Sequence, residues 1–484
     1  MSDEIRTLKP GALWRNFADL NAVPRPSKKE QKVRKFMVGF GENLKLETIV
    51  DPVGNVIIRK PASPGMENRK TIVMQSHLDM VCQKNSDSDF DFDTQGISMF
   101  VDGDWVRAKG TTLGADNGLG VASIMSVLES SDIAHPAIEA LFTIDEETGM
   151  TGAIGLQAGF LRGEILLNLD TEEDEEIGVG CAGGIDITAR KSYAPVATPV
   201  NARAFRITLN GLRGGHSGMD IHRGYGNANK LMNRILFTLN DAASISEIDG
   251  GGLRNAIPRE SNALVVCDDE QDLKSLLDQV SSEIAGEYQS IEKDLKILIE
   301  PVDVPATVLS KPDQEILVKT IYSIHNGVFR MSPDIEGLVE TSNSIARVLL
   351  KDGEIEISSL TRSSVESGKM DMAYHLRSGL ELGGFKVELS GSYPGWKPNP
   401  DSEILKVLEG VYEDIFDKKP QVLACHAGLE CGILGTNYPE MDMISFGPTI
   451  RGAHSPDERA SISSTRKYWK YLLKVLENIP VRKN

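Results

Sequence analysis

Cysteine is scarce in this chain, which has only five cysteines in 484 residues. An odd number of distant thiols fits neither a disulfide framework nor a zinc site built from cysteine pairs. Long apolar runs are also lacking, since no stretch approaches the roughly eighteen residues of a membrane-spanning helix. The charged opening MSDEIRTLK leads into no apolar segment either. We therefore expect a cytoplasmic protein with buried thiols, no secretory signal and no membrane partner.

Basic residues are too few to balance the acidic ones. The chain has 52 Lys and Arg against 70 Asp and Glu, a formal charge of -18. This acid excess disfavours nucleic acid and anionic membranes as partners. The remaining composition is that of an ordinary globular protein, 40% hydrophobic and 25% charged, and the length favours two domains.

Short apolar runs alternate with helical patterns in the first part of the chain. After two helices separated by the break Pro24-Arg25-Pro26, strands are predicted at residues 55–59, 71–75, 138–144 and 165–169, with a helix at 119–128. Nearly continuous apolar strands are typical of a sheet that is covered on both faces. The alternation of strands and helices predicts an α/β fold.

The pattern changes after the glycine cluster at 178–184. Strands at 204–209, 262–267, 338–350 and 354–360 now share the segment with long helices, which is an α+β order. The segment PGWKPNP at 394–400 is typical of a hinge, and a last helix, strand and helix follow it. We predict a catalytic domain in two parts, 1–185 and 398–484, interrupted by an inserted α+β domain at 186–397.

Polar residues follow the strand predicted at 71–75. His77 and Asp79 share a face there, because residues two apart in an extended chain point the same way. A carboxylate beside a metal-bound histidine is a usual arrangement, although a lone His-x-Asp pair is weak evidence. Asp116 lies in the glycine-flanked loop GTTLGADNGLG, where an ordinary helix cap is the simpler interpretation.

Further carboxylates stand near the other predicted strands. Glu146 and Glu147 end the strand at 138–144, where they repel one another unless a cation or proton lies between them; a solvated loop explains them equally well. Asp170 closes the strand at 165–169, and His454 lies in RGAHSP beyond the last strand. We interpret the acidic run at 172–176 as solvated.

The common placement of these clusters is a stronger signal than any one of them. In an open α/β sheet, the loops beyond the carboxyl ends of the strands form the site, and we assign all five clusters to such loops. Two histidines with three or four carboxylates and no thiolate suit a pair of divalent ions, such as zinc, manganese or cobalt.

These motifs resemble those of the co-catalytic zinc peptidase family, which holds aminoacylases, carboxypeptidases, tripeptidases and dipeptidases. The matching stretches occur in the family's order: VPRPSK (23–28), SHLDM (76–80), GADNG (114–118), DEETG (145–149), LDTE (169–172), GGHSG (214–218), CHAGLECG (425–432) and GAHSP (452–456). The resemblance is strongest to the branch that cleaves Xaa-His dipeptides such as carnosine. It implies an α/β catalytic domain with a mixed sheet flanked by helices, interrupted by an inserted α+β lid domain.

The resemblance also implies roles for individual residues. Two metal ions per chain, with zinc favoured over manganese or cobalt, would be bridged by Asp116. The remaining ligands would be His77 and Asp170 at one ion, and Glu147 and His454 at the other. Glu146 would be the general base with Asp79 behind His77, and the Asp116–Asn117 bond would be cis.

In the inserted domain, the resemblance implies substrate contacts. His216 would bind the substrate carbonyl or carboxylate, and Asn262 and Arg362 would hold the substrate carboxylate and the oxyanion. Gly428 would offer a backbone contact. A homodimer is expected, and whether His216 serves its own subunit or a partner stays open.

The resemblance therefore implies a di-metal dipeptidase for Xaa-His substrates, in which Glu146 activates water. A tripeptidase, an N-acyl-amino-acid deacylase and a carboxypeptidase remain alternatives within the same chemistry. A phosphoesterase also uses paired metals, but no basic phosphate clamp lies near the clusters. A catalytically dead peptide-binding protein is the alternative of another class, and the intact Glu146 argues against it.

Overall fold

The computed structural model describes residues 3–482 and divides into two compact units. Unit 1 comprises Met1–Gly180, Pro398–Ala424 and Leu429–Asn484, and unit 2 comprises Cys181–Lys397 and Cys425–Gly428. The insertion predicted at 186–397 falls within unit 2, which also takes four residues, 425–428, from the second half of the chain.

Unit 1 is built on an eight-stranded sheet. Its strands, in spatial order, are β1 (Glu47–Val50), β2 (Val56–Lys60), β6 (Ile138–Thr143), β3 (Ile72–His77), β7 (Ile165–Asn168), β23 (Asp442–Ser445), β8 (Glu176–Cys181) and β22 (Gln421–Cys425). The central strands β6, β3, β7 and β23 run parallel, whereas β1, β2 and β8 pair antiparallel. The expected mixed sheet is confirmed.

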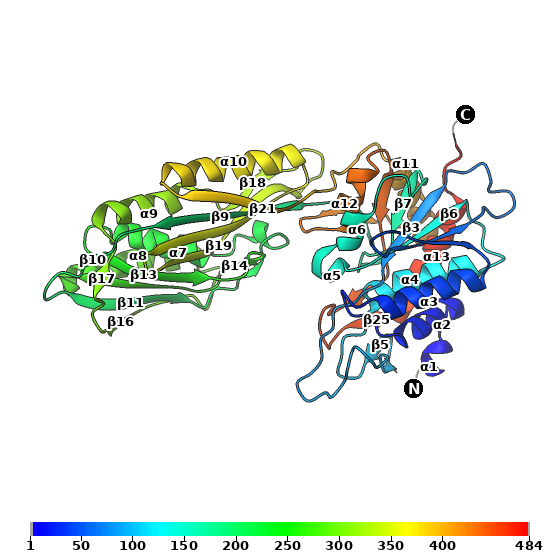
Figure 1. Cartoon of the computed structure of the whole chain (residues 1–484), viewed down its shortest axis with the longest axis horizontal. Helices are drawn as coiled ribbons and strands as arrows, with labels where there is room; N and C mark the ends of the chain where they lie inside the picture. The colour runs from blue at the N-terminus through cyan, green and yellow to red at the C-terminus, as the bar shows by residue number, and fades with distance from the viewer. Residues whose placement is uncertain (1–2, 483–484) are drawn as a thin grey trace. The chain divides into compact units, whose positions relative to one another are not determined.

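Burial explains why the central strands have no polar alternation. Every residue of β3, β6 and β7 is buried, as in a sheet that is covered on both faces. The helices of this unit are α1 (Asp3–Arg6), α2 (Gly11–Asn21), α3 (Gln31–Asn43), α4 (Ala115–Glu129), α5 (Glu146–Gly149), α6 (Thr151–Gly155), α11 (Glu403–Phe416), α12 (Glu430–Asn437) and α13 (Ile462–Glu477) (Figure 1). Helix α4 packs on β3 and is buried along nearly its whole length.

Unit 1 also contains a separate four-stranded antiparallel sheet. Its order is β24 (Ile450–Arg451), β25 (Arg459–Ser461), β5 (Trp105–Ala108) and β4 (Met99–Asp102). The chain leaves β5 and enters α4 through a loop that ends at Gly114, whose φ of 71° lies in the left-handed region that favours glycine.

Unit 2 is a nine-stranded antiparallel sheet with helices on it (Figure 1). The strand order is β16 (Lys296–Val302), β11 (Arg203–Asn210), β15 (Ser261–Cys267), β13 (Ser244–Gly251), β19 (Val339–Lys351), β20 (Glu354–Ser363), β9 (Gly183–Ser192) and β21 (Lys386–Tyr393), with β18 (Gly327–Met331) paired to β19. Two short ribbons accompany it: β10 (Val196–Ala197) with β17 (Thr307–Val308), and β12 (Gly215–His216) with β14 (Ala256–Ile257).

The helices of unit 2 share one apolar core with its sheet. They are the 3-10 helix η1 (Ile221–Arg223), α7 (Ala228–Thr238), α8 (Glu270–Tyr288), α9 (Lys311–Ser323) and α10 (Glu366–Leu382). Apolar side chains from α7 to α10 and from the inward faces of the strands form a single buried cluster, consistent with the predicted α+β order. Within residues 3–482, no helix combines the length and the apolar character needed to cross a membrane.

Candidate metal centre

Three of the candidate segments leave the parallel strands at the same edge of the sheet. His77 is the last residue of β3, Glu146 and Glu147 begin α5 after β6, and Asp170 lies two residues beyond β7. Because β6, β3 and β7 are adjacent and parallel, their carboxyl ends lie side by side. The placement inferred from the sequence is confirmed for these three.

The same inference was wrong for Asp116, and His454 follows the carboxyl end of β23 only after the short strand β24. Asp116 belongs to the first turn of α4, which follows β5, and His454 lies between β24 and β25. Both therefore come from the side of the four-stranded sheet, since β5 and β25 are paired. Two sheets, not one strand edge, bring the five segments together.

Asp116 lies between the two histidines and directs one carboxylate oxygen to each. Its Oδ1 is 3.2 Å from Nε2 of His77, and its Oδ2 is 3.2 Å from Nε2 of His454. Asp170 Oδ1 lies 3.6 Å from the same nitrogen of His77, and Glu147 Oε2 lies 3.1 Å from that of His454. The result is two groups of three possible ligands, which share Asp116.

Asp79 connects His77 to the segment that carries both glutamates. Its Oδ1 accepts a hydrogen bond from the backbone N–H of Glu146 (3.0 Å) and its Oδ2 accepts one from that of Glu147 (3.2 Å). Nδ1 of His77 lies 3.1 Å from the backbone carbonyl oxygen of Asp79 and 3.5 Å from its Oδ1. Burial alone would raise the pKa of Asp79, but the contacts with His77 hold it at about 2. Asp79 is thus an ionised group that orients His77 and fixes the start of α5.

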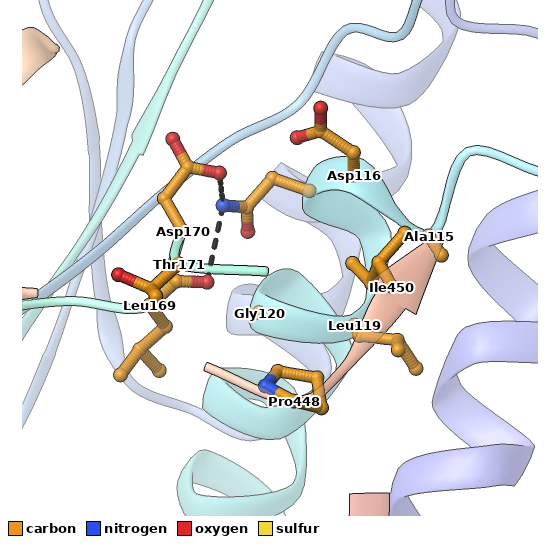
Figure 2. Close-up of a pocket in the computed structure, with 10 residues that line it drawn as sticks. Ala115, Asp116, Leu119, Gly120, Leu169, Asp170, Thr171, Pro448 and Ile450 are labelled. Atoms are coloured by element: carbon orange, nitrogen blue, oxygen red, sulfur yellow. Dashed lines mark hydrogen bonds between the residues drawn. The ribbon is translucent and has the colours of Figure 1, made fainter. Parts of the chain in front are cut away.

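Asn117, the residue after Asp116, is also held by its neighbours. The Asp116–Asn117 peptide bond is cis, as the resemblance implies. The amide of Asn117 donates to the Leu169 carbonyl (3.1 Å) and to the carboxylate of Asp170. Figure 2 draws these bonds as dashed lines among the residues that line a small pocket, where Asp116, Leu169 and Asp170 are labelled.

Negative charge exceeds positive charge in this site. Burial raises the pKa of Glu146 to about 8, and the neighbouring carboxylates of Glu430 and Glu147 add to the rise. Burial likewise raises the pKa of Asp170 well above its usual range. Oε1 of Glu147 is buried without a hydrogen-bond partner, and Glu146 forms a further possible ligand group with His77 and Glu147. Imidazole and carboxylate donors with surplus buried charge fit divalent cations.

Two glutamates near this site were missed by the sequence analysis. Glu172, assigned to a solvated run, is only partly exposed, and burial raises its pKa to about 7 with Asp116 as the main charged neighbour. Glu430 is buried, and its Oε2 accepts hydrogen bonds from Gln75 and Thr143, both at 2.7 Å. The spacing of Glu172 two residues after Asp170, and the lone charge in the stretch LECGILG, were signals that pointed to them.

Unit 2 contains a second cluster of candidate site residues, which is rich in hydrogen-bond donors. Nη2 of Arg362 lies 3.4 Å from Nε2 of His216, and its Nη1 donates to the Tyr393 hydroxyl at 2.9 Å. Nδ1 of His216 accepts hydrogen bonds from the backbone N–H groups of Gly218 and Met219. A neutral His216 therefore carries its proton on Nε2, so both groups at the 3.4 Å contact are donors. They are arranged to share an acceptor.

The other two predicted substrate residues lie differently. Asn262 is on β15, where its side chain accepts a hydrogen bond from Thr208 at 2.8 Å. Strands β13 and β19 separate β15 from β20, which carries Arg362, so three strand spacings of about 4.8 Å lie between them. The structure thus does not place Asn262 beside Arg362. Gly428 ends the segment Cys425–Gly428, whose carbonyls at Cys425 and Ala427 accept from the N–H of Ala182.

Comparison with known proteins extends these observations. The profile of peptidase family M20/M25/M40 matches residues 73–478. The cytosol non-specific dipeptidase of Escherichia coli (strain K12) is 44% identical over 483 residues, which cover 99% of this chain and all of that protein. A crystal structure of aminoacylhistidine dipeptidase from Vibrio alginolyticus superposes with a TM-score of 0.94 at 44% identity, over 99% of each chain.

A more distant likeness concerns the fold alone. The aminopeptidase PepT structure from Bacillus cereus gives a TM-score of 0.58 at 15% identity, covering 98% of this chain and 99% of that one.

Proposed function

The chain belongs to peptidase family M20/M25/M40, and from that premise we propose that it is a metal-dependent dipeptidase. The observation that carries the proposal is the carboxylate of Asp116, with one oxygen facing His77 and the other facing His454. One ion would be held by His77, Asp116 and Asp170, and the other by Asp116, Glu147 and His454. Zinc suits this donor set, and manganese or cobalt are the alternatives.

The protein's own residues divide the work of hydrolysis. When bound, two divalent ions acidify a water and polarise a carbonyl. Glu146 would take the proton of the attacking water and return it to the departing amine. Asp79 holds Glu146 in place through the backbone N–H at 3.0 Å. His216 and Arg362 would donate to a substrate oxygen, which gives the developing charge an oriented partner.

The names of the two similar proteins differ in substrate range, one being a non-specific dipeptidase and the other an aminoacylhistidine dipeptidase. We propose that this chain cleaves dipeptides broadly and that Xaa-His dipeptides are among its substrates. The test combines metal analysis of purified protein with hydrolysis of dipeptides that vary at the second residue. Tripeptides, N-acetyl amino acids and a phosphate monoester form the comparison panel.

We expect two ions per chain and turnover of the dipeptides alone. Faster cleavage of tripeptides or N-acetyl amino acids would favour a tripeptidase or a deacylase. The absence of metal together with the absence of turnover would favour a peptide-binding protein.

We also propose a cytoplasmic location, a homodimer and a lid role for residues 186–397. The location is supported by the name of the Escherichia coli relative. Sedimentation analysis tests the dimer, and a monomer at all concentrations would exclude it. Small-angle scattering with a non-hydrolysed dipeptide analogue tests the lid, for which we expect a smaller radius of gyration. An unchanged radius would count against closure.

A further inference from the structure

The loop that leads into Asp116 is held by a buried carboxylate to which no role has yet been given. Glu458 is 2% exposed, and it accepts hydrogen bonds from four consecutive backbone N–H groups. Its Oε2 binds those of Leu113 (2.7 Å) and Gly114 (2.9 Å), and its Oε1 binds those of Ala115 (2.7 Å) and Asp116 (3.2 Å). Charge-assisted bonds of this kind are stronger than neutral ones. The loop is therefore fixed on its N–H side.

A buried cation holds a carbonyl of the same loop. Arg25 is 1% exposed, and its Nη2 donates to the Gly114 carbonyl at 2.5 Å and to the side chain of Asn21 at 3.0 Å. Its Nη1 donates to the carbonyls of Leu78 (3.1 Å) and Asp79 (3.0 Å). Arg25 thus ties the loop before Asp116 to the two residues that follow His77.

The two groups connect the segments that carry three of the proposed ligands. Arg25 joins the loop of Asp116 to that of His77. Glu458 lies four positions after His454 and joins the same loop to the segment of that histidine. Packing leaves little freedom, because a Cβ on Gly114 would lie 2.4 Å from Nη2 of Arg25. The planar fork of arginine reaches acceptors on separate segments from two nitrogens in fixed directions, whereas a lysine carries its three donors on one nitrogen.

We propose that Arg25 and Glu458 are positioning residues that set the place of Asp116 between the two metal ions. Neither residue touches an ion or the substrate; both act on the backbone that carries the ligands. This assigns a role to Arg25 in the stretch VPRPSK, which matched the family without an explanation. The inference rests on the proposed metal centre, so the experiment must separate its failure from the failure of that centre.

The test uses Glu458→Gln and Arg25→Lys in the full chain. Each metal-loaded protein is titrated with a chelator to obtain its metal affinity, and each apo protein is loaded with Co²⁺ to record the visible spectrum. Glutamine presents an N–H₂ group to two of the four N–H donors, and lysine loses part of the fork. We expect a loss of about 10- to 100-fold in affinity for at least one ion, as is usual when the partners of ligands are changed. The Co²⁺ spectrum should change with it.

Glu139→Gln is the matched control. Glu139 is also buried in unit 1, and its Oε2 accepts from the backbone N–H groups of Arg162 (2.6 Å) and Gly163 (3.0 Å), at the other end of β6. It should lower thermal stability without changing metal affinity. If Glu458→Gln does not fold, Arg25→Lys carries the same test.

Two outcomes are distinguishable. A wild-type chain that binds no pair of ions would overturn the proposed function. A wild-type chain that binds two, with both variants keeping its affinity and Co²⁺ spectrum, would overturn the positioning role alone.

Discussion

The candidate sites of the two units differ in the sign of their buried charge. In unit 1, the carboxylates of Asp116, Glu147 and Asp170 meet two histidines, with one glutamate oxygen left unpartnered. In unit 2, Arg362 is 4% exposed, its Nε has no hydrogen-bond partner, and within residues 3–482 no carboxylate forms an ion pair with it. Buried charge is costly unless it is paired. The same rule thus predicts cations for the first site and an anionic or carbonyl oxygen for the second.

The largest effect should come from Glu146→Gln. The substitution keeps the size of the side chain and removes the proton acceptor, so we expect kcat to fall by about 100- to 10,000-fold. Metal content should stay at two per chain, because the two groups that share Asp116 do not contain Glu146.

Glu173→Gln is a suitable control for this variant, because Glu173 pairs with Arg451 and is about one-third exposed on its side chain. Unchanged turnover in Glu146→Gln would remove the general base from the proposal. Loss of one ion would instead make Glu146 a ligand.

Arg362→Lys should separate the two sites. A lysine keeps the charge but cannot contact Tyr393 and also reach the position beside His216. Loss of one charge-assisted bond, about 1.5–3 kcal/mol, predicts a decrease in kcat/KM of about 10- to 150-fold. Steady-state kinetics and metal analysis check this. A change in metal content would mean that Arg362 affects metal binding as well as substrate binding.

Much of unit 1 could be predicted from the sequence, because its central strands are short apolar runs that end in polar residues. The predicted strand at 71–75 is β3, and the residues that follow it are buried as expected of a site. Asp116 and His454 could be named from motifs but not placed, because their position depends on the pairing of β5 with β25, and no local pattern encodes pairing between segments 350 residues apart.

The roles of Glu172 and Arg25 also could not be predicted from local sequence patterns. Glu172 was assigned to solvent because acidic runs usually are solvated, and only its distance from Asp170 along the chain hinted otherwise. Arg25 lies in a Pro-rich break that predicts a turn, yet its guanidinium binds carbonyls more than fifty residues away. Such roles follow from tertiary contacts.

A smaller effect concerns the stability of unit 2 at acid pH. Burial, with Arg362 nearby, lowers the pKa of His426 to about 3, and its Nε2 lies 2.8 Å from Ser342 Oγ. The unfolded chain has a histidine pKa of about 6.5, so it binds a proton that the folded chain does not. Stability should therefore fall as pH drops below about 6.5, by about 2 kcal/mol at pH 5.

Denaturant unfolding of wild type and His426→Gln at pH 7.5 and pH 5 measures the contribution of His426 to this pH dependence. We expect wild type to lose about 2 kcal/mol more than the variant between the two pH values. Equal losses would show that His426 is not held neutral by its surroundings.

The smallest expected effect distinguishes a binding pair from a structural pair. Nε2 of His216 and Nη2 of Arg362 are both donors 3.4 Å apart, so they gain nothing from each other until an acceptor lies between them. A double-mutant cycle of His216→Gln and Arg362→Lys should therefore give a coupling of about 1 kcal/mol in kcat/KM. The same cycle measured by unfolding of the substrate-free chain should give a coupling near zero. Coupling in the unfolding free energy without substrate would mean that the two side chains stabilise each other directly. The pair would then be structural, and unit 2 would not contain a binding site for a substrate oxygen that contrasts with the cation site of unit 1.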